Sequence, residues 1–182
     1  MASGSGSTVQ AILDAAADAA FEGEIAGAGT DVKGCGAMRR AERAGVPTFA
    51  VPLRDFADRA AWNAALSEQL DALQPDLVVL AGFMRLLGAD VVRRFRIVNT
   101  HPALLPAFPG AHAIRDALAA GVNVTGVTVH WVDEGVDTGP AIVQAEVPVE
   151  AGDTEDSLRA RVQAVEKPLY VNAIRQLCRE MT

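Results

Sequence analysis

The sequence predicts an α/β protein with a doubly wound, mostly parallel sheet, helices on both faces, and antiparallel late strands. Short apolar runs alternate with longer amphipathic patterns along the chain. The strongest run, residues 76–81, is apolar almost throughout, as in a parallel strand covered on both faces. Residues 125–132 and 141–149 instead alternate like antiparallel strands. We expect one domain over residues 1–182, with right-handed crossovers and ligands at the carboxyl ends of the strands.

In the first half of the chain, helical and strand patterns take turns. Gly45 and Pro75 each follow a helical pattern, as is typical of a helix end. The third helix has an inner stripe of Trp62, Leu66, Leu70 and Leu73. The expected helices are 9–20, 36–44 and 58–73, and the expected strands are 24–29, 47–51 and 76–81.

The second half continues the alternation and then changes character. Gly121 ends one helix, and Thr154 is the expected N-cap of a long terminal helix. The expected helices are 88–95, 111–120 and 154–179, and the expected strands are 96–99, 125–132 and 141–149. The late strand pair gives the sheet a mixed rather than purely parallel order.

Composition excludes several classes of protein. The chain has 182 residues, half of them apolar, and a net charge of −7, so it lacks the basic footprint of a nucleic-acid-binding protein. No apolar run approaches the ~20 residues of a membrane span. Two distant cysteines suggest neither a disulfide framework nor a metal site. The start of the chain has no signal-peptide pattern, and we expect a cytoplasmic protein without nucleic-acid or membrane partners.

A Gly/Ser-rich segment, residues 3–8, leads directly into the first helix. Glycines allow a tight turn that exposes backbone N–H groups, and a helix N-terminus favours an anion, so the segment is a candidate phosphate site. It matches neither a dinucleotide fingerprint nor a P-loop. A flexible linker or a plain helix cap is the alternative that this segment alone leaves open.

Two polar residues, Asn99 and His101, stand at the end of a predicted strand and are followed by Pro102. Period two points both side chains the same way. Histidine can act as an acid, a base or a cationic partner of an oxyanion, and asparagine can donate to an oxyanion. A buried histidine bonded to backbone is the alternative, but the proline-rich loop that follows favours function.

A third segment, residues 130–140, places Asp137 in a tight loop between the late strands. Its carboxylate could orient and charge His101, or take a proton through water. An acidic surface turn is the alternative. Residues 81–87 follow the best strand and could line the pocket of a flat aromatic ligand, or simply begin the next helix.

Taken together, these segments resemble the formyltransferase family that uses 10-formyltetrahydrofolate. Asn99, His101 and Asp137 match its catalytic Asn, His and Asp. The resemblance covers nearly the whole chain and is strongest to the branch that acts on glycinamide ribonucleotide in purine biosynthesis. It rests on the Gly/Ser segment and on residues 81–87, 99–112 and 129–140. The branch that formylates a tRNA shares the triad but carries a basic second domain.

The resemblance implies how the work is divided. It implies a Rossmann-like sheet, a small phosphorylated amine and a reduced folate as substrates, no metal, and a monomer or homodimer. Asn99 and protonated His101 would stabilise an oxyanion, while Asp137 pairs with His101. The substrate would be bound by Gly6, Ser7, Thr8, Gln163 and Glu166, and the folate by Met84, Arg85, Leu87, Val132, Asp133 and Glu134.

The chain departs from the family pattern at three places. Only Met1 and Ala2 precede the Gly/Ser segment, where the family has an apolar strand. The link into Asn99 is tight near residue 95, and the chain stops at Thr182, where the family continues. We therefore expect a shortened chain whose sheet leaves backbone groups unpaired. Two other functions stay open beside formylation of glycinamide ribonucleotide. The chain could be a formyltransferase with another amino-sugar or nucleotide acceptor, or a shortened, non-catalytic binding version of the fold.

Overall fold

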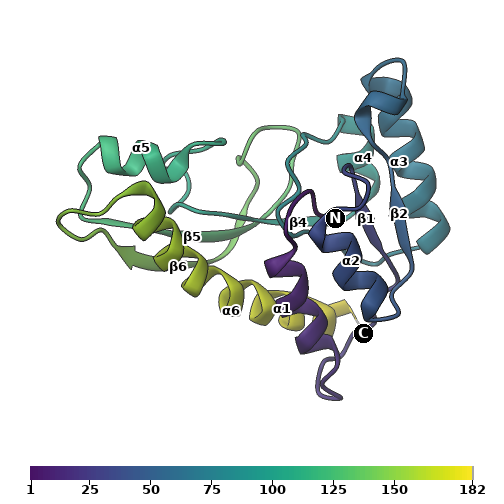
Figure 1. Cartoon of the computed structure of the whole chain (residues 1–182), viewed down its shortest axis with the longest axis horizontal. Helices are drawn as coiled ribbons and strands as arrows, with labels where there is room; N and C mark the ends of the chain where they lie inside the picture. Colours follow the sequence, from purple (N-terminus) through teal and green to yellow (C-terminus); the bar gives the residue numbers. More distant parts are fainter. Residues whose placement is uncertain (182) are drawn as a thin grey trace. The chain divides into compact units, whose positions relative to one another are not determined.

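The computed structural model describes residues 1–181. Its backbone contacts divide the chain into two compact units (Figure 1). The first unit comprises residues 1–97 and 175–181, and the second comprises residues 98–174. The expectation of one domain over residues 1–182 stays a prediction. The fold class is confirmed, because parallel strands, helices and a later antiparallel sheet are all present.

The first unit alternates helices and short strands. β1 and β2 run parallel, with Gly29 opposite Phe49. Asp58 caps α3 by accepting a hydrogen bond from the N–H of Ala61 at 2.8 Å. The elements are α1 Ser7–Ala16, β1 Ala28–Thr30, α2 Gly36–Arg43, β2 Thr48–Ala50, a 3₁₀ turn Leu53–Asp55, α3 Arg59–Leu73, β3 Val78–Leu80 and α4 Ala89–Arg94.

Burial on the inner side of α3 organises this unit. Trp62 and Leu66 are completely buried, and the indole N–H of Trp62 donates to the carbonyl of Val51 at 2.8 Å. The Trp62 ring also stacks on Phe83, with centroids 6.4 Å apart. The expected inner stripe is confirmed except at Leu73, which is half-buried where the helix ends.

The first three residues of the chain lie between the segments of β1 and β3. The N–H of Ala2 donates to Gly29 O at 3.0 Å, and the N–H of Ala81 donates to Met1 O at 2.8 Å. The N–H of Ser3 donates to Gly82 O at 3.0 Å. These backbone groups are therefore paired at the place where the sequence led us to expect a missing strand.

The second unit is an antiparallel sheet covered by helices. β4 Ile97–His101 pairs with β5 Val124–Trp131, which pairs in turn with β6 Ala141–Pro148. The expected antiparallel pair is confirmed. α5 Ala113–Ala119 and the first part of α6 Glu155–Met181 pack on the sheet. Their shared core is Ile114, Val127, Val147, Leu158 and Val162.

Two anchors fix α6 within this unit. At its start, the hydroxyl of Thr154 accepts a hydrogen bond from the N–H of Ser157 at 3.2 Å, which confirms the expected N-cap. Further along, the buried hydroxyl of Tyr170 donates to Val98 O at 2.9 Å. The second anchor ties the helix to β4, the strand that carries Asn99 and His101.

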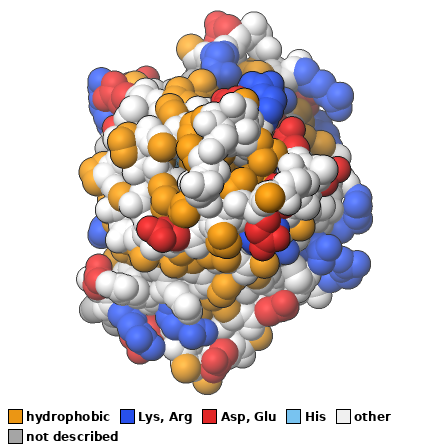
Figure 2. All heavy atoms as spheres, turned by 90° about the vertical axis from the view of Figure 1, so that its left-hand side faces the viewer, with side chains coloured by type: hydrophobic (Ala, Val, Ile, Leu, Met, Phe, Trp, Pro, Cys, Tyr) orange, Lys and Arg blue, Asp and Glu red, His pale blue; other side chains and the backbone are white. Residues whose placement is uncertain are grey.

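The surface carries both signs of charge. Figure 2 shows one face, on which acidic and basic side chains are dispersed among apolar ones. Among the described residues, no helix is both long and apolar enough to cross a membrane.

Candidate active site

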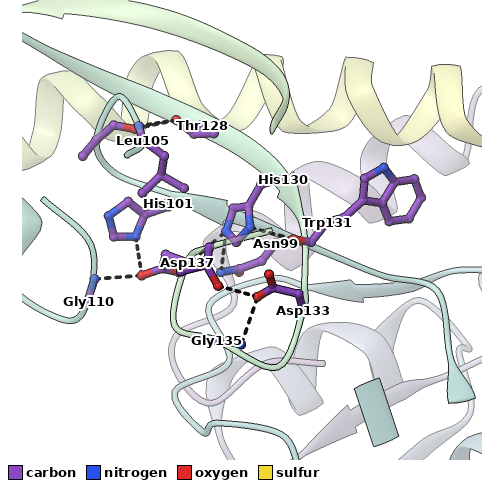
Figure 3. A network of polar contacts seen from close by, with 12 residues as sticks. Asn99, His101, Leu105, Gly110, Thr128, His130, Trp131, Asp133, Gly135 and Asp137 are labelled. Carbon is purple, nitrogen blue, oxygen red and sulfur yellow. Dashed lines mark hydrogen bonds and ion pairs between the residues drawn. The ribbon is translucent and has the colours of Figure 1, made fainter. Parts of the chain in front are cut away.

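Two strands of the second unit bring the predicted polar residues together. Asn99 and His101 lie two residues apart on β4, and β4 pairs with β5 so that Asn99 is opposite His130. Both side chains point into the network of polar contacts drawn in Figure 3. His101 is buried, with 4% of its surface exposed.

Asp137 reaches the same network from the loop between β5 and β6. Its Oδ2 accepts a hydrogen bond from the N–H of Gly110 at 2.8 Å and lies 3.2 Å from His101 Nδ1. The backbone of Asp137 has a φ of 55°, a left-handed conformation that Asp and Asn tolerate better than most residues. The structure thus brings together the three expected catalytic residues.

Asp133 shapes the loop that carries Asp137. Its Oδ1 accepts hydrogen bonds from the N–H of Gly135 at 3.0 Å and from the hydroxyl of Thr138 at 2.6 Å. A carboxylate that closes its own loop in this way holds an otherwise open turn in one conformation. This oxygen of Asp133 is therefore engaged in loop structure.

Both ring nitrogens of His101 face acceptors. Nε2 lies 2.7 Å from the carbonyl oxygen of Phe108, and Nδ1 faces the Asp137 carboxylate. A carbonyl can only accept, so Nε2 carries a proton. A proton on Nδ1 as well satisfies the carboxylate, so the geometry fits the doubly protonated, cationic ring.

The loop that supplies Phe108 and Gly110 is held by Thr128 of β5. The buried hydroxyl of Thr128 donates to Ala103 O at 2.7 Å and accepts from the N–H of Leu105 at 3.0 Å. Gln144 of β6 donates to Leu105 O at 2.9 Å. These bonds fix the loop from which the acceptor of His101 and the donor to Asp137 both come.

His130 also belongs to this network, although the sequence did not mark it as a site residue. It is 2% exposed, and its Nε2 lies 3.6 Å from Asp137 Oδ1 and 3.5 Å from Asn99 Nδ2. Burial lowers the pKa of His130 below its ordinary value of 6.5. The sequence could have indicated His130 only through the antiparallel pairing of the two strands, which puts it opposite Asn99.

The Gly/Ser segment forms an ordered helix start in the first unit. Gly6 is the N-cap of α1 with a φ of 77°, and a Cβ added there would lie 2.4 Å from Ala37 Cα. Glycine is thus required by both conformation and space. Ser7 and Thr8 form the first turn of α1. The segment is part of the folded first unit, and the expected phosphate site stays a prediction.

Residues 81–87 form a loop after β3 rather than the start of a helix. Arg85 Nε lies 2.6 Å from Oδ2 of Asp31, whose side chain is 1% exposed. The N–H of Met84 donates to Ser3 Oγ at 2.9 Å, which ties this loop to the Gly/Ser segment. Sequence reasoning missed Asp31, because only tertiary folding brings the end of β1 beside Arg85.

The remaining expected ligand-binding residues lie in the second unit. Glu166 is half-buried on α6, and burial raises the pKa of its carboxyl above the ordinary 4.5. Gln163 is exposed one turn earlier. Val132 and Asp133 are half-buried and Glu134 is exposed, in the loop that leads to Asp137.

Comparison with known proteins decides the family. The formyl transferase family model matches residues 1–174. The chain belongs to the formyl transferase family. The phosphoribosylglycinamide formyltransferase of Mycobacterium tuberculosis is 49% identical over 97% of this chain and 82% of its own length. That of Bacillus subtilis is 38% identical over 97% of this chain and 91% of its own.

Solved structures agree with this assignment. Glycinamide ribonucleotide transformylase 1 from Symbiobacterium toebii superposes with a TM-score of 0.94 at 45% identity, covering 98% of this chain and 85% of that one. The chain therefore shares the formyl transferase fold. Across residues 1–181, no group of three or more His, Cys, Asp or Glu side chains is arranged to hold a metal ion.

Proposed function

We propose that this chain transfers the formyl group of 10-formyltetrahydrofolate to the amine of glycinamide ribonucleotide, a step of purine biosynthesis. The observation that carries the proposal is the contact of Asp137 with His101, which shares β4 with Asn99. It is joined by the membership of the formyl transferase family and by relatives named for this reaction.

The chemistry is a direct acyl transfer. The amine nitrogen attacks the formyl carbon, and the carbonyl electrons move to oxygen to give a tetrahedral oxyanion. Collapse of this intermediate re-forms the carbonyl and breaks the bond to N10 of the folate. The amine loses a proton and N10 gains one, so the reaction needs neither a metal nor a covalent enzyme intermediate.

In this reaction, residues of the second unit stabilise the negative charge that develops on the formyl oxygen. Both N–H groups of His101 are held by Phe108 O and Asp137, so its cationic ring, which is 4% exposed, acts on the oxyanion by charge rather than by a hydrogen bond. Asn99 supplies an N–H donor. Asp137 keeps the ring charged and, after the attack, can take the amine proton through a water molecule.

Binding of the two substrates is assigned by the same proposal. Gly6, Ser7 and Thr8 hold the phosphate at the N-terminus of α1, with Gln163 near it and Glu166 on the ribose hydroxyls. The folate is held by Met84, Arg85, Leu87, Val132, Asp133 and Glu134, partly through backbone groups. The protein acts as a monomer or homodimer.

A panel of acceptors tests the assignment of substrate. With 10-formyltetrahydrofolate as donor, kcat/KM is measured for glycinamide ribonucleotide, for an amino-sugar nucleotide and for the dephosphorylated glycinamide riboside. We expect the ribonucleotide to be preferred over both by at least about a hundredfold, because the other two lack the phosphate or the ribose hydroxyl pattern. Preference for the amino-sugar nucleotide would replace the proposed acceptor. Folate binding without transfer to any of them would make the chain a binding protein.

A further inference from the structure

A second histidine, His130, lies against the proposed catalytic residues. It is on β5, opposite Asn99 on β4, and is fully enclosed, with 2% of its surface exposed. Figure 3 shows its ring beside Asn99 and Asp137. The groups around it define which of its nitrogens carries a proton.

The Nδ1 atom of His130 carries that proton. It lies 2.9 Å from the carbonyl oxygen of Trp131, which can only accept a hydrogen bond. In the neutral ring, Nε2 then has no hydrogen and can only accept. The donor that faces Nε2 is the side-chain amide nitrogen of Asn99, at 3.5 Å. This pairing also sets the orientation of the Asn99 carboxamide, with its nitrogen toward His130 and its oxygen away.

The charges around His130 favour the neutral form. The titratable groups that face it are Asp137, His101 and Asp133. Burial disfavours the charged ring and outweighs the carboxylates, which lowers the pKa of His130. His101 meets two acceptors, at 2.7 and 3.2 Å, and takes the positive charge beside Asp137. His130 meets the carbonyl of Trp131 at 2.9 Å and the amide nitrogen of Asn99 at 3.5 Å, and the Asp137 carboxylate lies further away at 3.6 Å. A second cation here would also repel the first.

We propose that His130 is a positioning residue that acts, as a neutral hydrogen-bond acceptor, to hold one N–H of the Asn99 carboxamide and so aim the other N–H at the oxyanion. The proposal rests on the proposed formyl transfer. If the Asn99 carboxamide could rotate freely, some molecules would turn its oxygen toward the oxyanion. Two oxygens that carry negative charge repel each other, so those molecules would stabilise the oxyanion less.

The same geometry predicts the response to acid. When Nε2 of His130 gains a proton, it can no longer accept from Asn99. Its new N–H then faces Asp137 Oδ1, which lies 3.6 Å from Nε2 in the structure. Asn99 then loses its partner, and Asp137 has two cations to neutralise. Turnover should therefore fall on the acid side as His130 becomes charged, with the affinity for both substrates less affected.

The tautomer is tested first, without any activity measurement. The chain has three histidines, so nitrogen and carbon imidazole shifts can be assigned with the His112→Gln and His130→Gln variants. We expect His130 to be neutral at pH 7 with its proton on Nδ1. The Asn99→Ala substitution should move the Nε2 shift of His130 and leave that of exposed His112 in place. A charged His130, or a proton on Nε2, overturns the proposal even if the chain transfers formyl groups.

A pair of substitutions then tests the role in catalysis. In His130→Asn, the amide can still donate to Trp131 O but nothing accepts from Asn99, so we expect kcat to fall about 10- to 100-fold with both KM values nearly unchanged. In His130→Gln, the longer side chain places a neutral acceptor near the former Nε2. It should recover most of that loss and flatten the acid side of the kcat profile.

A double-substitution cycle separates positioning from packing. In an Asn99→Ala background, His130→Asn should cost little further turnover, because the group that it positions is gone. Equal losses in both backgrounds would overturn the positioning role while leaving the proposed function intact. An inactive wild-type chain would instead refute the proposed function, and the imidazole shifts would still decide the tautomer.

Discussion

At the scale of single residues, one carboxylate organises the site. Asp137 contacts His101 and Gly110 through one oxygen, and its other oxygen faces His130. The two histidines differ because their partners differ. His101 meets a carbonyl and a carboxylate, whereas His130 meets a carbonyl, an amide nitrogen and, at the longer distance of 3.6 Å, the same carboxylate. These partners fit a cationic ring at His101 and a neutral acceptor at His130.

The Asp137→Asn substitution tests the charge of this carboxylate. Asparagine has the same size, tolerates the left-handed φ of 55° and can still accept from the N–H of Gly110. The charge beside His101 is lost, and the oxygen that faces His130 is replaced by an amide nitrogen. We expect kcat to fall on the order of a hundredfold, as when a positioned acid–base group is removed. Steady-state kinetics on folded protein should show unchanged KM values. Near-normal turnover would reduce Asp137 to a turn residue.

Glu166→Gln should gain stability and lose affinity for the ribonucleotide. Burial raises the pKa of Glu166, so folding favours its protonated form, and the ionised carboxylate at neutral pH opposes folding. The contribution of protonated Glu166 to stability is fully present below its ordinary pKa of 4.5 and is lost as the pH rises through its raised pKa. The glutamine variant should therefore unfold at a higher Tm than the parent at pH 7.5 but at nearly the same Tm at pH 4.

The functional half of that prediction is a higher KM for the ribonucleotide in Glu166→Gln, with the KM for folate unchanged. Thermal unfolding at both pH values, together with kinetics at pH 7.5, measures the two effects on one preparation. A lower Tm at pH 7.5 would mean that the Glu166 carboxylate has a stabilising partner when ionised.

At the scale of elements, the start of α1 carries the proposed phosphate site. Gly4 is exposed, and a Cβ added there would have no atom within 4 Å. At Gly6 a Cβ would collide with the backbone of Ala37. Gly4 is therefore the position at which a side chain tests binding without disturbing the fold.

We expect Gly4→Asp to weaken binding of the ribonucleotide at least about tenfold. That factor corresponds to roughly 1.4 kcal/mol of repulsion between the new carboxylate and the phosphate. Gly4→Asn has the same shape without the charge and is the matched control. Calorimetric titrations with each substrate should show the loss for the aspartate variant and the ribonucleotide only. Equal weakening by both variants would indicate a steric effect and remove the phosphate from this place.

The start of α6 depends on an ion pair. Arg161 contacts Asp153 through both of its terminal nitrogens, at 2.6 and 3.1 Å, and Asp153 also accepts from Ser157 and from the N–H of Glu150. Hydrogen bonding to Arg161 is the main cause that holds the pKa of Asp153 well below its usual value. The stabilising effect of ionised Asp153 is therefore present above pH 3.8, its ordinary pKa, and is lost as the pH falls below that toward its lowered pKa.

Asp153→Asn should therefore lower Tm at pH 7, by an amount that shrinks as the pH is brought below 3.8. Glu155→Gln is the control, since Glu155 meets Arg159 in an exposed pair of the kind that contributes little. Thermal unfolding of both variants across this pH range makes the comparison. An equal effect of the two substitutions would contradict the special role of Asp153.

Elements with local end signals were predictable from the sequence. The helix expected over 36–44 is present as α2 Gly36–Arg43, and Gly45 beyond it has the expected positive φ of 74°. The helix expected over 9–20 ends at Ala16, because Asp18 closes a turn by accepting from the N–H of Ala20. The strand expected over 24–29 is reduced to Ala28–Thr30, which is set by pairing with a distant strand.

The site was predictable to the extent that its chemistry is local. Asn99 and His101 follow from strand periodicity, but the contact of His101 with Asp137 crosses 36 residues (137 − 101) and came from a family resemblance. His130 was missed because strand register determines what it faces. Asp31 was missed because its partner, Arg85, lies on another loop.

At the scale of the whole molecule, the proposed function uses residues of two chemically different units. The first unit holds the glycine-rich start of α1 and the loop after β3, and the second holds the three proposed catalytic residues and Glu166. The proposed reaction is direct transfer of the formyl group from folate to amine on this one chain.

A single-turnover experiment tests whether the formyl group passes directly from folate to amine. The intact chain, in excess over 10-formyltetrahydrofolate and saturated with glycinamide ribonucleotide, is quenched at successive times, and both products and the protein mass are measured. Direct transfer predicts that tetrahydrofolate and formylglycinamide ribonucleotide form with one shared rate constant while the protein mass stays unchanged. Absence of the formylated product, or release of tetrahydrofolate before it with a formyl group on the protein, would contradict direct transfer.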